Sequence, residues 1–576
     1  MPENPENNQT YDWGYWTLGI IAALALFWGL GHYALWGSED RWAEIVREML
    51  LNKDYIHPAI NGQVYFDKPL LSYWLIVFVT FFCNCLNEFV VRAPSALSAL
   101  AGICATVYIG RKLFEREVGI TAGWILLSSL GFLFWGRTAA ADMENLAAIA
   151  IAVAWFMARE KKAGFFSYLL FYLICFLGAM AKGLPALVVP IVIIIPYVLM
   201  KGRWKNHVKF SNFLAALVGA AIYFLPFYLA SVTEMPPHYF NPASNLSGLE
   251  LVWQENILRV FNPLDHNDEY WFSYFYHVPR IMAPWIVFLI PAIIAVIVRW
   301  KDLKKNDRWL AWATLFVFIL FSASSSRRWY YILPIMPFCS LMIARFLCSS
   351  SHGKWEKMII EIVRWLVVAV AIIEAISIVF ASLWGQIFDL DLPWILLLST
   401  PILGVTTLLV MFIDERGDRQ RIKQFTGMPK SFGGIILGGT ILICGLFSFQ
   451  LPSINKFRSE KPFALKMKNE LINIKPENII VYPKIPVKLI FYMKLSRPVH
   501  VVNNIDDMKK IINSTTGKFV IVSYNKEKYL SELAKIIPRK VVDNPDYKED
   551  FTPFENKEKA RKIYIWLINN KTRGIK

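Results

Sequence analysis

The sequence YWTLGIIAALALFWGLGHYALW, residues 15–36, is followed at once by GSEDRWAEIVREML, residues 37–50. The first stretch is apolar, and about 20 apolar residues in a helix are enough to cross the hydrocarbon core of a bilayer. It is too long for a cleavable signal peptide and lacks a small-residue cleavage site, so it predicts a permanent membrane anchor. Glu39, Asp40 and Arg41 therefore lie where the chain leaves the membrane. Charged side chains so close to the hydrocarbon core are energetically costly and rare, so they are candidates for a functional role.

The composition excludes an ordinary soluble protein. Of the 576 residues, 56% are hydrophobic and 18% are charged, and the mean hydropathy is +0.40. The length suffices for many membrane spans and one soluble domain. The seven cysteines lie in or beside apolar runs, without metal-ligand spacing or a disulfide pattern. We interpret them as small buried hydrophobic residues.

Apolar runs recur along the chain and predict an α-helical polytopic membrane domain, residues 1–455, with about 13 transmembrane helices, some of them short or interrupted. The runs lie near 14–36, 93–110, 120–136, 141–158, 164–181, 184–200, 210–231, 277–298, 309–323, 331–347, 360–382, 392–413 and 433–450. A further run, Pro69 to Cys85, suits either a short span or a helix at the membrane interface. We expect an outer loop over 37–92 that carries interfacial helices.

Basic segments indicate the orientation. If Pro69–Cys85 does not cross, six charged segments share one face, at 111–117, 159–162, 201–205, 299–308, 354–357 and 418–423. The positive-inside rule makes this face cytoplasmic, which favours an interfacial or re-entrant Pro69–Cys85. We therefore expect a multi-pass protein of a bacterial inner membrane. The loops with unusual polar residues then face the periplasm, where we expect the chemistry.

The segment 456–576 has the pattern of a soluble α/β domain. Strand-like runs at 478–483, 499–504, 518–524 and 562–568 alternate with helical patterns at 506–513 and 528–537. The segment holds 26 Lys and Arg against 13 Asp and Glu, and so carries +13 of the net charge of +17. On the periplasmic side it either meets anionic lipid headgroups or has an ordinary solvated surface. No nucleic-acid motif is present, so we expect no nucleic-acid partner.

The outer loop begins with an expected interfacial helix over 41–51, which has Trp42, Ile45 and Met49 on one face. Glu39 and Asp40 precede this helix, where a carboxylate either caps the helix or acts as a general base or metal ligand. Lys68 lies where the chain returns to the interface, and it either snorkels to water or provides a fixed positive charge.

Other outer positions combine positive charge with aromatic rings. Asp142, in GRTAAADMEN, begins a span, and an intramembrane carboxylate is a functional candidate by default. Lys182, in MAKGLPA, lies at a break before a helix N-terminus that suits phosphate. Arg327 and Arg328 lie beside Tyr331 in SSSRRWYYILP. We expect these positively charged side chains to lie near the ends of the membrane spans, where they suit a site that binds the phosphate of a lipid.

The ordered motifs of residues 15–345 resemble the bacterial aminoarabinose transferases of lipid A, and the remainder resembles them more loosely. This family belongs to the GT-C superfamily, which also contains the protein O-mannosyltransferases. The resemblance rests on agreement of many motifs in order rather than on any single one. The motifs that agree include EDRWAEIVREML at 39–50, NGQVYFDKP at 61–69, RAPSAL at 92–97, AKGLPA at 181–186, WQENILRV at 253–260 and SSSRRWYYILP at 324–334.

The resemblance implies an inverting transfer of a sugar from undecaprenyl phosphate to a periplasmic acceptor, lipid A or a related glycolipid. It implies catalytic carboxylates at Asp142 and at Glu39 or Asp40, and donor-phosphate contacts from Lys68, Lys182, Arg327, Arg328, Tyr65 and Tyr331. The lipid phosphate is the leaving group, so cations must stabilise the charge that grows on it. A phosphate acceptor is already an anion, whereas a hydroxyl acceptor requires deprotonation.

One position departs from this family, which has Asp and then Glu directly after the first span. Alignment on Arg41 places Ser38 and Glu39 at these two positions and leaves Asp40 as an extra carboxylate. Either Glu39 or Asp40 is the base, with Glu39 favoured because it keeps the family spacing, or the acceptor is an anion that needs no base.

A divalent metal ion is a further hypothesis, because Asp67 and His266 lie in outer loops and have suitable ligand atoms, although His266 equally suits an ordinary loop. Two alternative functions remain. An enzyme like the protein O-mannosyltransferases would act on exported proteins with the same scaffold. A lipid-linked sugar flippase would show internal repeats of spans, and we see none in the sequence.

The expected orientation is open to a direct test. Single cysteines at Asn61 and Ser459, in a background without reactive cysteines, should be labelled by a membrane-impermeant maleimide added from the periplasm, and one at Asp302 should not. Labelling of Asp302 from outside would reverse the orientation of every loop.

Overall fold

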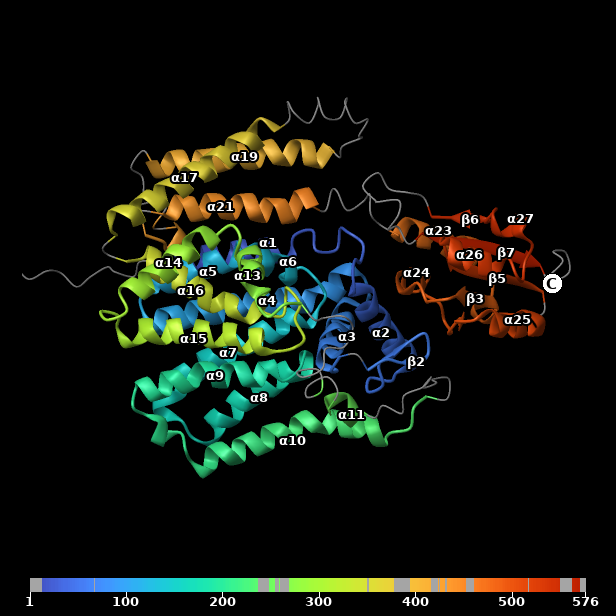
Figure 1. The fold of residues 1–576 in the computed structure, drawn as a ribbon, viewed down its shortest axis with the longest axis horizontal. Helices are drawn as coiled ribbons and strands as arrows, with labels where there is room; N and C mark the ends of the chain where they lie inside the picture. Colours follow the sequence, from blue (N-terminus) through green and yellow to red (C-terminus); the bar gives the residue numbers. More distant parts are fainter. Residues whose placement is uncertain are drawn as a thin grey trace, which may run out of the picture.

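Apolar helices pack side by side into a bundle, and a small α/β domain lies at one end of it (Figure 1). This computed structural model describes residues 13–66, 68–236, 248–253, 258, 269–349, 352–377, 394–415, 423, 425–429, 432–451, 460–515, 517–549 and 562–569. Asp67 and His266, the two expected metal ligands, and Ser459 lie outside the described residues.

The described part of every apolar run expected from the sequence contains one helix or a pair of helices. The first run, 14–36, is helical only as far as Phe27, and residues 28–36 form turns and irregular backbone. A helix is the natural choice because it satisfies its backbone hydrogen bonds internally, which lipid requires. The bundle contains α1 (Trp13–Phe27), α4 (Glu88–Leu113), α5 (Arg116–Leu127), α6 (Leu130–Gly136), α7 (Ala141–Arg159), α8 (Phe165–Ala181), α9 (Pro185–Met200), α10 (Phe210–Val232), α13 (Tyr274–Met282), α14 (Ile286–Val298), α15 (Lys305–Ala323), α16 (Met336–Leu347), α17 (Lys354–Ala375), α19 (Trp394–Glu415) and α21 (Gly433–Gly445). The short helix α11 (Gly248–Trp253) follows α10.

The helices differ in length. Among the described residues, four helices are long and apolar enough to span a membrane on their own: Glu88–Leu113, Ala141–Lys162, Phe210–Val232 and Gly433–Gln450. The pair α5 and α6 is a fifth apolar segment, bent by 68°. Its bend follows from Ser128 and Ser129, whose hydroxyls donate to the carbonyls of Trp124 and Ile125 one turn earlier. Most of the remaining expected spans are shorter apolar helices of 10–17 residues. The helices α15 and α17 are longer, with 19 and 22 residues, but each begins with a charged turn.

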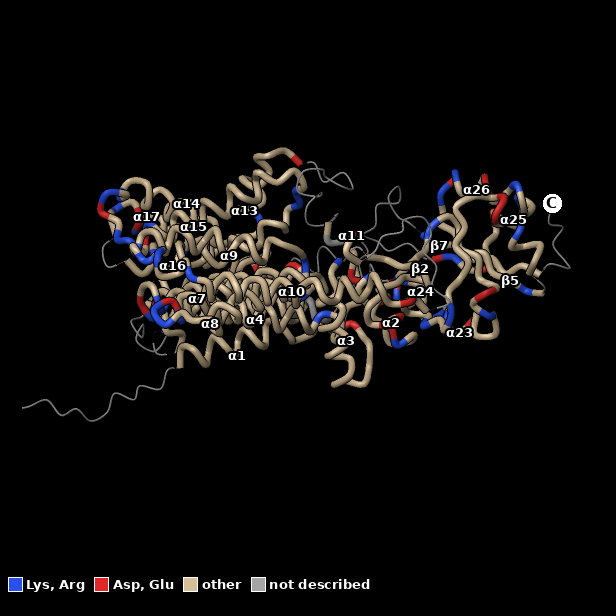
Figure 2. The backbone as a smooth tube through the Cα atoms, turned by 90° about the horizontal axis from the view of Figure 1, so that it is seen from below, with Lys and Arg blue, Asp and Glu red and all other residues tan. Residues whose placement is uncertain are grey.

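Charged residues gather at the two ends of the molecule (Figure 2). Most of the bundle between the ends is drawn without charge, whereas Lys, Arg, Asp and Glu crowd the loops near α16 and α17 and the surface of the α/β domain. This distribution is what a membrane-embedded bundle requires, because a charge inside the hydrocarbon core is costly.

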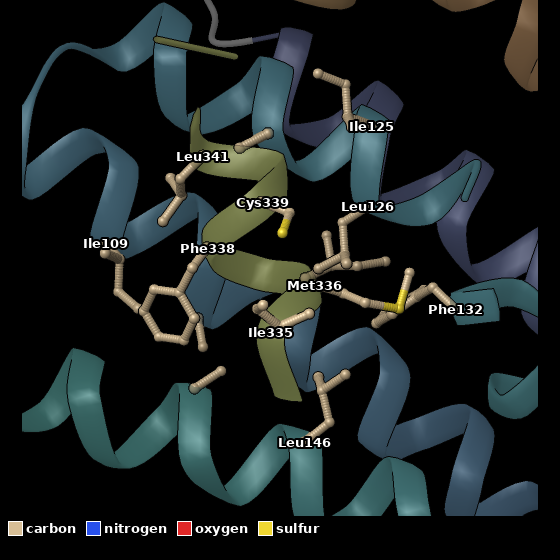
Figure 3. Close-up of a cluster of buried hydrophobic side chains, with 14 of the residues drawn as sticks. Ile109, Ile125, Leu126, Phe132, Leu146, Ile335, Met336, Phe338, Cys339 and Leu341 are labelled. Carbon is tan, nitrogen blue, oxygen red and sulfur yellow. The ribbon is translucent and has the colours of Figure 1, made fainter. Parts of the chain in front are cut away.

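The helix α16 forms the centre of the bundle core. Figure 3 shows its Met336, Phe338 and Leu341 between side chains of the helices around it, among them Phe132 of α6 and Leu146 of α7. These side chains are almost fully buried. Such dense packing holds helices together in lipid, where the hydrophobic effect between helices is weak.

The expectation that all seven cysteines are buried is wrong for three of them. Cys175 and Cys339 are buried, but Cys83, Cys85 and Cys104 are exposed. Cys104 lies on an outward face of α4, which lipid rather than protein would cover. Apolar surroundings in the sequence therefore did not distinguish the protein core from the lipid-facing surface.

The ambiguous run Pro69–Cys85 forms α3 (Leu71–Cys83), whose two ends lie at the same end of the bundle. Near its start, the Ser72 hydroxyl donates to the Ala181 carbonyl, directly before Lys182. After its end, Glu88 at the start of α4 contacts the α/β domain. A helix of 13 residues is about 20 Å long and does not cross a 30 Å hydrocarbon core.

The α/β domain is built on a five-stranded sheet with the order β4-β3-β5-β7-β6. The strands β4 (His500–Val501), β3 (Ile479–Tyr482) and β5 (Lys518–Tyr524) are parallel, and β7 (Ile563–Asn569) is antiparallel to β5 and to β6 (Tyr547–Lys548). The helices are α23 (Lys461–Glu470), α24 (Val487–Met493), α25 (Ile505–Ser514), α26 (Glu527–Leu533) and α27 (Arg539–Val542). The four strands and two helices expected here are all present.

The α/β domain shares a hydrophobic core with the outer loop. This core joins α2 (Glu39–Asn52) and α3 to α23, α24 and β3. The loop also carries a hairpin of β1 (Ala59–Ile60) and β2 (Gln63–Val64), with a turn at Asn61 and Gly62. Both turn residues have positive φ, which an Asn-Gly turn accommodates. The Asn61 amide donates to the Val499 carbonyl (2.9 Å) and accepts from the Val499 N–H (2.8 Å), so the hairpin is fixed to the domain.

Because Asn61 is buried, the exposed Ser496 is the better periplasmic labelling position for the orientation test.

The buried position of Asn61 makes its substitution a test of how the domain docks on the outer loop. Asn61→Gly keeps the positive φ but removes both hydrogen bonds, so we expect docking to weaken by about 1–3 kcal/mol.

The docking measurement is amide hydrogen exchange at Val499, which should become faster in Asn61→Gly, together with a lower melting temperature in detergent. Asn473→Gly, at an exposed position of the same domain, is the matched control and should leave both unchanged. Unchanged exchange at Val499 in Asn61→Gly would contradict the docking contact.

Candidate functional site

Two buried arginines hold the chain as it leaves α1. Arg137 donates to the carbonyls of Ala25 and Trp28, which are among those left unsatisfied at the end of a helix. Arg92 of α4 donates to the carbonyls of Leu30, Tyr33 and Ala34, each at 2.9 Å. The segment between α1 and α2 thus has no regular structure of its own and is held by side chains from the bundle.

Glu39 completes this arrangement. Arg92 binds it through two hydrogen bonds, Nε to Oε1 at 2.8 Å and Nη2 to Oε2 at 2.6 Å. The backbone N–H groups of Ala139 and Trp36 donate to the same two oxygens, at 2.8 and 3.0 Å. Both Glu39 and Arg92 have 0% exposure. A carboxylate with four donors and no access to solvent is a structural anion rather than an accessible base, so we infer a positioning role for Glu39.

Asp40 points in another direction, towards the α/β domain. Its Oδ1 accepts from the Arg41 N–H (2.8 Å), and Lys488 of α24 is the strongest of the nearby cations. Burial raises the pKa of Asp40, and Lys488 partly offsets this effect. We infer that Asp40 supports the start of α2 and its contact with the domain.

A cavity of about 170 Å³ lies beside this segment, between the outer loop and the ends of the bundle helices. Six of the site residues expected from the sequence line this cavity although they are far apart in the sequence: Tyr65, Lys68, Asp142, Lys182, Arg328 and Tyr331. Its lining residues are Ser38, Arg41, Trp42, Tyr65, Lys68, Tyr73, Trp135, Ala140, Ala141, Asp142, Lys182, Arg328, Tyr330 and Tyr331. Ser38, not Glu39 or Asp40, is the residue of that triplet that faces the cavity.

Asp142 and Lys182 form the centre of the cavity wall. Asp142 lies in the first turn of α7, and its Oδ1 is bonded to the Lys182 ammonium. The same ammonium lies 4.6 Å from the ring centre of Tyr331 and 5.5 Å from that of Tyr330. The carboxylate and the two rings stabilise the ammonium in a site from which water is largely excluded.

Two tyrosine hydroxyls orient the neighbouring arginines. Arg41 Nη1 donates to the Tyr65 hydroxyl at 2.7 Å, and Arg328 Nη1 donates to the Tyr330 hydroxyl at 2.9 Å. Arg327, in contrast, is not part of the lining and donates to the carbonyls of Ser322 and Glu269. The two adjacent arginines therefore have different roles, Arg328 in the cavity and Arg327 in holding the loop.

The cavity has a strong excess of positive charge. Arg41, Lys68, Lys182 and Arg328 line it, and Asp142 is the one carboxylate among its described lining residues. Cations in a confined site with limited water attract anions more strongly than they do at an open surface. The cavity is therefore suited to bind phosphate groups.

The described part of the chain contains no group of three His, Cys, Asp or Glu residues placed to hold a metal ion. Asp67 and His266 lie outside the described residues, so the metal site stays a prediction.

Sequence reasoning missed the residues that shape the cavity rather than charge it. Arg92 lies inside the quoted motif RAPSAL, but nothing in that motif indicates a partner 53 positions earlier. Trp42 and Tyr73, whose rings are 4.8 Å apart, and Trp135 appeared as ordinary apolar residues. Arg41 could have been found, because it is the cation beside the quoted carboxylates.

Comparison with known proteins places this arrangement in context. Residues 67–229 match the family described as dolichyl-phosphate-mannose-protein mannosyltransferase. The undecaprenyl phosphate-α-4-amino-4-deoxy-L-arabinose arabinosyl transferase of Edwardsiella ictaluri is 27% identical over 65% of this chain and 66% of its own length. The enzyme of the same name from Yersinia enterocolitica is 31% identical over 58% of this chain and 59% of its own length. The matched regions thus span about three-fifths of the length of these relatives.

The similarity of fold extends further than that of sequence. The crystal structure of ArnT from Cupriavidus metallidurans in the apo state matches 97% of this chain and 98% of its own, with a TM-score of 0.69 and 18% identity. The structure of the same protein bound to undecaprenyl phosphate matches 90% of this chain and 94% of its own, with a TM-score of 0.67 and 19% identity.

The role of Glu39 is tested by removal of its charge. Glu39→Gln leaves the Arg92 guanidinium buried without an anion, so we expect a loss of about 3–5 kcal/mol of stability and a low yield of folded protein. Asp40→Asn is the matched control, and we expect it to lose much less stability, because the Asn side-chain oxygen can still accept from the Arg41 N–H. The measurement is the melting temperature in detergent for both variants.

The competing outcome is distinct. A Glu39→Gln variant that melts like the parent but transfers sugar at least about tenfold more slowly would identify Glu39 as a general base. A folded but inactive Asp40→Asn would move the base to Asp40.

Proposed function

We propose that this chain, a relative of the undecaprenyl phosphate aminoarabinose transferases with their fold, is a membrane glycosyltransferase that uses a sugar linked to a polyprenyl phosphate. The observation that carries this proposal is the convergence of Lys68, Lys182 and Arg328 on one cavity at the ends of the bundle helices. A lipid phosphate linked to a sugar is the donor that this charge and this location fit.

The reaction is a displacement at the anomeric carbon of the donor sugar. An acceptor oxygen attacks this carbon, the bond to the lipid phosphate oxygen breaks, and the configuration inverts. Negative charge grows on the leaving phosphate as the bond breaks. Lys182 and Lys68 stabilise this charge because they are already in place and water is largely excluded, which is the condition for strong electrostatic catalysis.

Arg41 and Arg328 extend the positive surface on either side of this pair. Their tyrosine partners fix the direction of each guanidinium. Donors that are already fixed need less reorganisation free energy during the reaction than mobile donors do. Tyr331 and Trp135 add aromatic surface that suits the faces of a sugar ring. The phosphate and the sugar of the donor thus each have complementary groups in the cavity.

The acceptor that the cavity favours is itself an anion. Ser38 lies where a carboxylate would serve as a base, Glu39 is enclosed by Arg92, and Asp142 is engaged by Lys182. An acceptor hydroxyl would need a base that this arrangement does not offer, whereas a phosphate acceptor arrives deprotonated. Lipid A or a related phosphorylated glycolipid is therefore the acceptor class we propose.

A protein acceptor, as for the O-mannosyltransferases, is the second candidate and is less consistent with these contacts because serine and threonine require that base.

We also propose that the cavity and the α/β domain face the periplasm. The α/β domain lies at the end of the molecule opposite α17 and the basic loop 354–357 before it (Figure 2). The cavity is lined by residues of the outer loop that packs on this domain, and the positive-inside rule assigns the basic loops at 299–308 and 354–357 to the cytoplasm.

The donor-phosphate role makes a quantitative prediction. Lys68→Ala and Lys182→Ala should each lower the transfer rate by about 10²–10³-fold, with folding retained, because the lost interaction is strongest when charge has moved to the phosphate. The assay is the initial rate of transfer by purified protein with undecaprenyl-phosphate aminoarabinose and lipid A.

Lys201→Ala is the matched control, because Lys201 lies at the other end of α9 and donates to Asn306. It should transfer sugar at the parental rate. Parental rates for both cavity variants would contradict the donor site, and transfer to an exported peptide but not to lipid A would favour the protein acceptor.

A further inference from the structure

Another cavity lies on the outside of the bundle, between α1 and α4. Its volume is about 260 Å³. The floor is apolar, and the lining residues are Tyr15, Leu18, Gly19, Leu100, Ile103, Cys104, Val107, Tyr108 and Arg111. We call this cavity the α1–α4 groove. Its mixture of an apolar floor and one polar end is unlike the candidate site, which is lined mostly by polar groups.

The groove lies at the end of the bundle opposite to the candidate site. The helix α4 begins at Glu88, which contacts the α/β domain, and the groove occupies its last three turns up to Arg111. The 23 residues between these two positions correspond to about 35 Å along the helix axis. This distance exceeds the thickness of the hydrocarbon core, so the polar end of the groove lies in the opposite headgroup region.

The polar end of the groove is basic. Arg111 lies at its mouth and Lys112 is its neighbour in the sequence, and among the described residues neither has an ion-pair partner. Arg116 lies over the Tyr15 ring, 5.4 Å from its centre. Of the nearby carboxylates, Glu117 is paired with Lys423 at 2.7 Å, and Glu115 is exposed. The cations therefore exceed the anions.

Two further features indicate a ligand. The Tyr15 hydroxyl is buried at the groove and has no hydrogen-bond partner among the described residues, and an unpaired buried hydroxyl is costly. Gly19 lies in the middle of the floor, and a side chain there would meet no atom within 4 Å. The absence of a side chain leaves this part of the floor open.

We propose that the α1–α4 groove binds an anionic diacyl phospholipid. One acyl chain lies along the apolar floor over Gly19 and Cys104, and the phosphate lies between Arg111 and the hydroxyls of Tyr15 and Tyr108. Basic pockets between transmembrane helices recognise anionic headgroups in this way. A zwitterionic lipid brings a cation next to Arg111 and Lys112, so the groove selects against it.

Cys104 provides a probe within the site itself. In a full-length variant with Cys83→Ser, Cys85→Ser, Cys348→Ala and Cys444→Ala, Cys104 is the exposed cysteine that remains, because Cys175 and Cys339 are buried. The measurement is the rate at which a membrane-permeant maleimide labels Cys104 in detergent. Dioleoyl phosphatidylglycerol or dioleoyl phosphatidylcholine is added in increasing amounts. We expect phosphatidylglycerol to slow the labelling at concentrations at least roughly fivefold lower than phosphatidylcholine does.

Two substitutions test the two parts of the site. Arg111→Gln should raise the phosphatidylglycerol concentration needed for protection by roughly fivefold and leave that for phosphatidylcholine unchanged. Gly19→Leu should fill the floor and abolish phosphatidylglycerol adducts in native mass spectra. Gly164→Leu, which also has no atom within 4 Å of the new side chain but lies away from the groove, should keep them.

The outcomes are decisive in both directions. Melting temperatures in detergent confirm that the variants fold, and Gly19→Leu should fold well because leucine is the better helix former. Equal protection by the two lipids would make the groove an ordinary contact with the bilayer. Absence of protection by either lipid, or adducts retained in Gly19→Leu, would likewise overturn the proposal.

Discussion

The ion pair between Glu39 and Arg92 is the constraint on which the candidate site depends. A charge buried at 0% exposure is tolerated only when its hydrogen-bonding capacity is satisfied, and here Arg92 reaches Glu39 and three carbonyls while Glu39 receives two further N–H groups. This network fixes the rotation of α2 at its first residue. Successive residues of a helix point about 100° apart, so with Glu39 turned inward, Ser38 faces the cavity and Asp40 faces the α/β domain.

The same constraint determines which charged groups line the cavity. With the carboxylate of Glu39 held by Arg92, the lining keeps one described carboxylate and four cations. Without a ligand, Asp142 and the rings of Tyr330 and Tyr331 stabilise Lys182. In the proposed reaction the donor phosphodiester carries one negative charge and gains more as the sugar leaves, and donors that are already oriented would favour that more highly charged state.

Much of this architecture could be predicted from the sequence because lipid imposes simple rules. Long apolar runs gave helices, and alternating strand and helix patterns gave the α/β domain with its strands in place. The cations Lys68, Lys182 and Arg328 were identified because a charge beside a span is rare. The partner of Glu39 was not identified, because a contact between residues 39 and 92 has no local pattern. The different roles of Arg327 and Arg328 depend on which way each side chain points, and the sequence does not specify that direction.

The contact of the α/β domain with the outer loop has a consequence for the order in which the protein is made. The Leu35 N–H donates to the hydroxyl of Tyr492 at 2.9 Å, and the same hydroxyl contacts Glu88 at the start of α4. These partners are separated by 457 residues. At a synthesis rate of roughly 5–20 residues per second, the ribosome reaches Tyr492 about 20–90 s after Leu35. The segment that positions Ser38 and Arg41 therefore lacks one of its supports until Tyr492 has been made. A product truncated before Tyr492 would hold this segment in place less firmly than the protein with its α/β domain does.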